Sequence, residues 1–107
     1  MKLTNAQKTH FDRLKRNIQA YVRRYTGGIE TYPQWYCGIT QNPDSRLIRH
    51  RQNAQVDTLE YYDWNAQWPI VAKELEYYFH KKGMQGAMSA GNWKKASFIY
   101  IFERPLD

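Results

Sequence analysis

The chain of 107 residues contains a single cysteine, Cys37, and no long apolar run. One thiol can neither form an internal disulfide nor build a cysteine-rich zinc site, so the fold uses neither. No apolar run approaches the ~20 residues that a membrane-spanning helix needs. The first sixteen residues also lack the apolar central region of a secretion signal. From these absences we expect a cytoplasmic protein with no membrane partner.

Acidic side chains are nearly missing from the first 25 residues, which hold seven Lys or Arg and only Asp12. The other 82 residues contain nine basic and nine acidic side chains, so the net charge of +6 belongs to the first segment. A basic stripe on one element is typical of nucleic-acid binding. The alternatives are a solvated basic helix and a helix that docks on an acidic protein.

The length favours one domain over residues 1–107, made of a basic helix over residues 1–28 and a core over residues 29–107. Hydrophobic residues make up 42% of the chain and aromatic residues 16%, which excludes a disordered tail.

Three helices are predicted, over residues 5–25, 43–53 and 70–82. In the first, apolar residues recur at three- and four-residue steps. Thr4 or Asn5 can cap its start, and Gly27-Gly28 can end it. The other two begin near prolines, which are favoured at the first helical position. The third carries a stripe that we expect to be buried: Val71, Ala72, Leu75 and Phe79.

Strand-forming residues occupy segments 29–40, 58–64 and 97–102. The segment between Gly27 and Gly38 is also compatible with a hairpin. Strands alternating with helices in this order predict an α+β domain, with a small and mostly antiparallel sheet flanked by helices.

The segment WYCGITQNPDSRLIRH changes its period in the middle. The strand triplet Tyr36-Cys37-Gly38 is followed by Asn42-Pro43, an N-cap residue and a proline suited to the first helical turn. Arg46 and His50 come next and, being four residues apart, share one face of the predicted helix.

This order of residues resembles the GIY-YIG nuclease family, and especially its small stand-alone members. In that family a Tyr-x-Gly strand leads into a helix with an essential arginine, which a histidine often follows one turn later. A glutamate on a later helix holds a divalent metal ion. Glu76, in the segment AKELEYYFHKKG, takes the glutamate position. The resemblance covers roughly residues 29–102 and implies a metal-dependent DNA endonuclease with Mg²⁺ or Mn²⁺ as cofactor.

The family's first motif, Gly-Ile-Tyr, is not intact. Gly28-Ile29 is followed by Glu30, and Tyr25 has the expected spacing but falls at the end of a predicted helix. One of the two family tyrosines is therefore missing or displaced. The alternative is a module of the same fold that binds nucleic acid without cutting it.

Four residues are the catalytic candidates. The guanidinium of Arg46 matches the geometry of a phosphate. His50 can accept a proton from water or a phenol, and Tyr36 can contact the nucleophile or act as the base. Glu76 supplies hard oxygen ligands to the metal ion. The arginines expected to contact the nucleic-acid backbone are Arg13, Arg16, Arg23, Arg24, Arg49 and Arg51.

Overall fold

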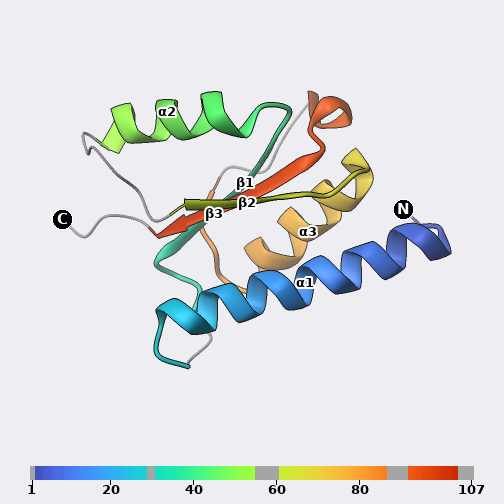
Figure 1. Ribbon diagram of the computed structural model, residues 1–107, viewed down its shortest axis with the longest axis horizontal. Helices are drawn as coiled ribbons and strands as arrows, with labels where there is room; N and C mark the ends of the chain where they lie inside the picture. The colour runs from blue at the N-terminus through green and yellow to red at the C-terminus, as the bar shows by residue number, and fades with distance from the viewer. Residues whose placement is uncertain (1, 29–30, 55–60, 87–91, 104–107) are drawn as a thin grey trace.

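The computed structural model describes residues 2–28, 31–54, 61–86 and 92–103 (Figure 1). It has three α-helices, three strands and a short 3₁₀ helix, which confirms the predicted α+β class. In chain order these are α1 (Asn5–Tyr25), β1 (Trp35–Thr40), α2 (Pro43–Ala54), β2 (Tyr61–Asn65), α3 (Pro69–Lys81), η1 (Asn92–Lys95) and β3 (Phe98–Glu103).

The three strands form one sheet in the order β1-β3-β2, and both pairings are antiparallel. The last strand in the sequence is therefore the central one. The hairpin considered between Gly27 and Gly38 is not formed by the described residues, because β1 starts only at Trp35 and pairs with β3. Pro33, which has no backbone N–H to donate, precedes it. Residues 58–60 of the second predicted strand lie outside the described part of the chain.

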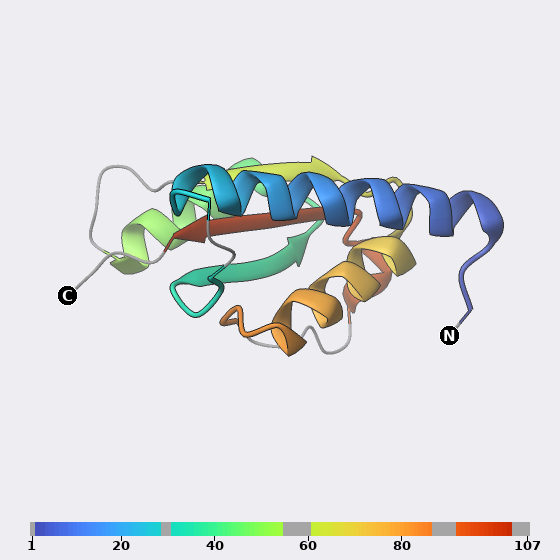
Figure 2. The same cartoon turned by 90° about the horizontal axis from the view of Figure 1, so that it is seen from below.

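Each face of the sheet is covered by a different set of helices (Figures 1 and 2). We call the face beneath α2 the α2 face, and the opposite one the α1/α3 face. Since side chains alternate along a strand, the register assigns each residue to a face. Tyr36, Gly38, Tyr100 and Phe102 lie on the α2 face, and Cys37, Ile39, Ile99 and Ile101 on the α1/α3 face.

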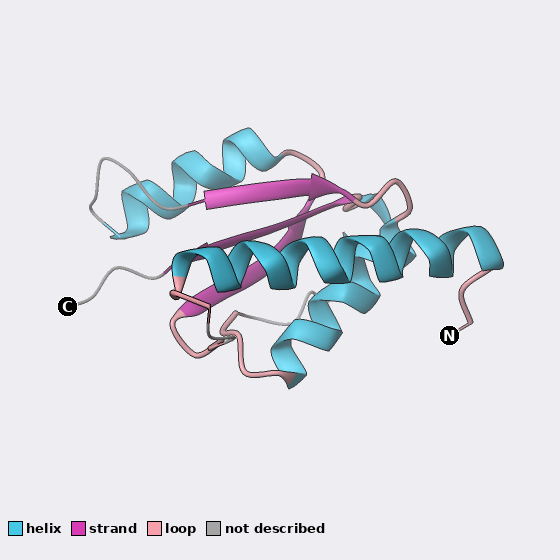
Figure 3. Cartoon of the chain, turned by 60° about the horizontal axis from the view of Figure 1, so that its bottom comes forward, coloured by secondary structure: helices cyan, strands magenta, loops and turns pink. Residues whose placement is uncertain are grey.

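Local signals in the sequence set the ends of α1. The Thr4 hydroxyl accepts a hydrogen bond from the Gln7 backbone, and the Gln7 side chain accepts one from the Thr4 backbone, which completes a capping box. Gly27 and Gly28 follow the helix with φ of 72° and 97°, conformations that a Cβ disfavours. The helix runs past the end of the sheet toward the N-terminus (Figure 3).

The buried stripe of α3 includes the four residues expected from the sequence and also Glu76. The core of the α1/α3 face is made of this stripe, Leu14, Ile18 and Val22 of α1, and the inward residues of β1 and β3. Within the described residues, none of the helices combines the length and apolarity needed to cross a membrane.

Candidate functional site

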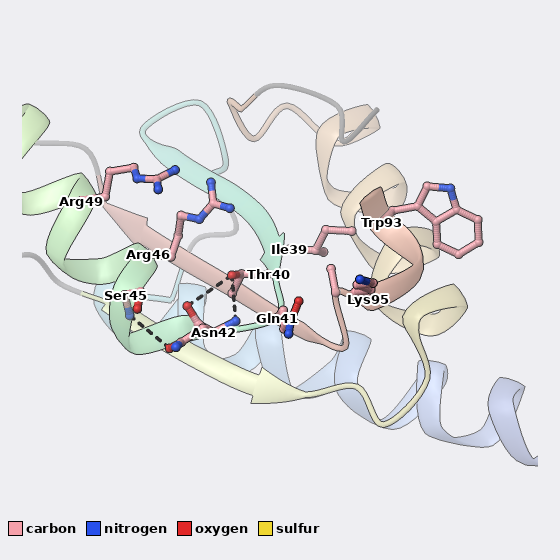
Figure 4. Close-up of a pocket in the computed structure, with 10 residues that line it drawn as sticks. Ile39, Thr40, Gln41, Asn42, Ser45, Arg46, Arg49, Trp93 and Lys95 are labelled. Atoms are coloured by element: carbon pink, nitrogen blue, oxygen red, sulfur yellow. Dashed lines mark hydrogen bonds between the residues drawn. The ribbon is translucent and has the colours of Figure 1, made fainter. Parts of the chain in front are cut away.

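The turn between β1 and α2 is held by its own side chains. Thr40 Oγ1 accepts a hydrogen bond of 3.0 Å from the Asn42 N–H and donates one of 3.2 Å to the Asn42 carbonyl. Asn42 Oδ1 accepts a 3.2 Å bond from the Ser45 N–H, so Asn42 caps α2 as expected. The start of α2, and with it Arg46, is therefore fixed against the end of β1 (Figure 4).

A cavity of about 510 Å³ lies where the end of β1, the first turns of α2 and η1 meet. Three cationic side chains line it, Arg46 and Arg49 from α2 and Lys95 from η1, and no acidic side chain among the described residues does. Figure 4 shows the two arginines on one side and Lys95 with Trp93 on the other. The remaining lining residues are Ile39, Thr40, Gln41, Asn42, Ser45 and Ala96. Such a pocket suits an anion.

His50 lies one helical turn after Arg46, against the aromatic residues of the α2 face. Its Nε2 is 2.9 Å from the Tyr100 hydroxyl oxygen, in a hydrogen bond whose direction follows the imidazole tautomer. Its ring centroid lies 5.0 Å from that of Tyr36 and 4.7 Å from that of Phe102. The structure therefore brings Tyr36, Arg46 and His50 together on one face, as the sequence predicted.

The cluster around His50 favours uncharged side chains. Burial first, and then the charges of Arg46 and Arg49, lower the pKa of His50. The imidazole is therefore neutral at pH 7 and has a lone pair that can accept a proton. Burial raises the pKa of Tyr100 far above its usual range. Its phenol stays protonated and positions His50 rather than acting as a base.

Tyr100 is a member of this site that the sequence analysis missed. Its side chain is 2% exposed, and its Cα lies opposite Gly38 in the sheet. Only the pairing of β1 with β3, across about 60 residues of sequence, brings it to His50. Tyr25, which has the spacing of the family's first tyrosine, lies instead on α1 and contacts Tyr21 and Trp35. The sequence did not identify Lys95 either, because only the tertiary fold brings η1 next to α2.

Glu76 is not part of this cluster. It is 1% exposed and lies in the buried stripe of α3, and its charge adds to burial in raising the pKa of the Cys37 thiol. Because Cys37 and Tyr36 are neighbours in a strand, they point to opposite faces of the sheet. Glu76 thus belongs to the α1/α3 face, and the sheet separates it from Arg46 and His50.

The position of Glu76 does not fit the expected metal site. A Mg²⁺ or Mn²⁺ ion held by one carboxylate keeps several waters and binds the substrate phosphate, which requires an accessible ligand. The carboxylate is buried on the far side of the sheet from Arg46. The described residues also contain no group of three His, Cys, Asp or Glu side chains that could hold a metal ion.

The arginines expected to contact nucleic acid lie on two sides of the molecule. Those of α1 are exposed, on the helix that covers the α1/α3 face: Arg13, Arg16, Arg23 and Arg24. Arg49 lines the cavity, next to Arg46. Arg51 is half-buried, and its Nε is buried with no hydrogen-bond partner among the described residues.

Comparison with models of known protein families, with curated proteins and with solved structures finds no match for this chain. The resemblance to the GIY-YIG family therefore rests on the motif residues alone.

The neutral state of His50 gives a first prediction. Because Arg46 contributes to lowering the pKa of His50, an Arg46→Gln variant is expected to raise it toward the ordinary value of 6.5. An NMR titration of the histidine ring protons measures the change. Arg16→Gln, on the other side of the sheet, is the charge-matched control and should leave the pKa of His50 unchanged. An unchanged pKa in Arg46→Gln would show that the two side chains do not interact.

Proposed function

We propose that this protein binds nucleic acid, with the cavity between β1, α2 and η1 as the site for a backbone phosphate. The convergence of Arg46, Arg49 and Lys95 on one cavity carries the proposal. A guanidinium presents a planar fork of donors that matches two phosphate oxygens, and a lysine adds a point charge. These three cations have no acidic partner among the residues that line the cavity, so a ligand can supply the negative charge.

The charge distribution also supports a nucleic-acid ligand. The first 25 residues carry an excess of six positive charges, and the arginines of this segment are exposed along α1. A long polyanion could contact both α1 and the cavity, whereas a small anion could use only the cavity. Phosphate contacts of this kind carry no sequence readout, so we expect binding of low sequence specificity.

Hydrolysis of DNA phosphodiester bonds is the second candidate function, and it is the one that the GIY-YIG resemblance implies. The arrangement of His50 favours it, because a neutral imidazole lies one turn from Arg46 and is held by Tyr100. Arg46 would stabilise charge on the phosphate. In the tautomer whose Nε2–H donates to the Tyr100 hydroxyl, the Nδ1 lone pair of His50 would accept the proton of the attacking water. The family's metal ion would supply Lewis-acid activation, but Glu76 is not positioned beside these residues.

One labelled duplex of about 20 base pairs tests both functions. In EDTA, fluorescence anisotropy should show binding whose affinity falls log-linearly with salt, because bound phosphates release counterions. Unlabelled DNA should displace the duplex, and polyglutamate should compete for the protein only weakly. Absence of binding near 50 mM salt would contradict the proposal.

The same duplex with Mg²⁺ or Mn²⁺ reports cutting. If the protein is a nuclease, His50→Ala should lose roughly 10²- to 10⁴-fold in rate while still binding. Glu76→Gln is the companion variant, and cutting that depends on Glu76 would contradict our placement of the site. If the wild-type protein binds the duplex but does not cleave it with either ion, the nuclease function is excluded.

A further inference from the structure

A second surface joins α1 to β2, an edge strand of the sheet (Figure 2). Tyr21 of α1 packs against Tyr62 and Trp64 of β2, with ring centroids 5.1 and 5.7 Å apart. Tyr25, one helical turn further along, lies 4.8 Å from Tyr21. We call these four residues the aromatic patch.

The aromatic patch forms a layer outside the core. Trp35 lies beneath it, fully buried, with its ring 6.0 Å from Tyr21 and 6.3 Å from Tyr25. Tyr62 and Tyr25, in contrast, are 49% and 47% exposed. Their rings are therefore held in place by packing on one side and are open to a ligand on the other.

α1 turns one side toward β2 and the other toward α3. The β2 side is marked by Tyr21 and by His10, whose Nε2 is 3.1 Å from the Asn65 carbonyl oxygen. The α3 side is marked by Gln19, which donates a 3.2 Å hydrogen bond to the hydroxyl of Tyr78.

The four exposed arginines of α1 lie on its outward side, opposite the buried Leu14, Ile18 and Val22. Arg24 follows Tyr21 by three residues, and Arg13 precedes Arg24 by eleven, which is three helical turns or about 16 Å. Arg13 and Arg24 therefore form a row beside the aromatic patch. Arg16 and Arg23, seven residues apart, lie on the same outward side but further from Tyr21 around the helix.

We propose that the aromatic patch and the row of Arg13 and Arg24 bind a single-stranded segment of nucleic acid. Unpaired bases stack on Tyr62 and Tyr25, and the arginines contact the phosphates. Aromatic rings beside a basic row form the usual binding surface for single strands, because every base offers a stackable face. Duplex bases are already stacked on one another and cannot use the rings.

The positive charge of this surface favours single-stranded nucleic acid over a second copy of the chain or an apolar protein segment. A second copy of the chain would bring the same excess of positive charge to the same surface. An apolar protein segment would gain nothing from the arginine row. The inference rests on the proposed function and adds its substrate class, namely nucleic acid with an unpaired segment. The cavity of Arg46 borders β1, the opposite edge strand, so the two sites can be tested separately.

The test compares a labelled oligothymidylate of about 15 nucleotides with a duplex hairpin of equal length, in EDTA. Tyr62→Ala should weaken oligothymidylate binding about tenfold and leave duplex binding within about twofold, because only the single strand loses a stacked base. Tyr62→Phe keeps the ring and should bind as the wild type does. Tyr77→Ala is the matched control, since Tyr77 is 48% exposed on α3 and away from the aromatic patch. Tyr25→Ala repeats the test independently if Tyr62→Ala is poorly folded.

Two results would overturn this inference while leaving the proposed function intact. Oligothymidylate binding could be unchanged in Tyr62→Ala, or the variant could lose oligothymidylate and duplex binding equally. If binding is unchanged and Tyr62→Ala also abolishes a concentration-dependent dimer, the patch contacts a second copy of the chain. A wild-type protein that binds neither probe would instead contradict the proposed function itself.

Discussion

Replacing Gly38 by alanine is expected to destabilise the protein by about 3 kcal/mol, the upper part of the usual cost of overpacking a core. A Cβ on Gly38 would overlap the Tyr100 hydroxyl oxygen and lie 2.6 Å from its Cζ and 2.9 Å from its Cε1. Tyr100 is buried, and a shift of its ring away from Gly38 would disturb its hydrogen bond with His50. Strand propensity alone predicts the opposite sign, because alanine is ordinarily favoured over glycine inside a strand.

Urea denaturation measures this effect, and a mutant cycle assigns its cause. Tyr100→Phe keeps Cζ and Cε1, so Gly38→Ala should still be costly in that background. Tyr100→Leu removes both atoms, and there Gly38→Ala should cost little. An equal cost in the wild-type and leucine backgrounds would show that the Tyr100 ring is not the reason for glycine at position 38.

The helices could be predicted closely because their signals are local. The capping box at Thr4, the two glycines after Tyr25 and the proline at position 43 lie within a few residues of the ends that they set. A periodic apolar stripe also identified the buried side of α3. Such signals need no knowledge of the partner against which a helix packs.

The pairing of strands could not be predicted in the same way. Period-two alternation shows which residues share a face, but it does not show which strand lies alongside. The central position of β3 brings Tyr100 opposite Gly38 and within reach of His50, and η1 just before it brings Lys95 to the cavity. Tyr100 and Lys95 thus reach the candidate site only through contacts that are distant in sequence.

The case of Glu76 shows the limit of a motif match. The spacing along α3 placed Glu76 at the family's glutamate position, and the same spacing is compatible with either face of the sheet. The structure puts this helix on the face opposite α2 and buries the carboxylate near Cys37. Tyr36, Arg46 and His50 lie near one another because one strand–turn–helix segment carries all three.

The largest effect on binding is expected from Arg46→Gln/Arg49→Gln. Hydrogen bonds to charged groups contribute about 1.5–3 kcal/mol each, so loss of both arginines should weaken duplex binding by roughly 100-fold or more. The slope of log affinity against log salt should become shallower by about 2, one for each phosphate contact that is lost. Arg46→Lys/Arg49→Lys keeps the charge but loses the fork, and should bind with intermediate affinity.

Lys81→Gln/Lys82→Gln provides the matched control, because it removes the same charge from exposed positions at the end of α3. The measurement that tests the central claim most directly is the salt dependence of duplex binding for these two double variants and the wild type. If the cavity holds a backbone phosphate, the double arginine variant should bind the duplex more weakly than the wild type and with a shallower salt dependence. The double lysine variant should bind the duplex with an affinity within a few-fold of the wild type. Equal losses in the two double variants would mean that only overall charge attracts nucleic acid, and would contradict a phosphate site at Arg46 and Arg49.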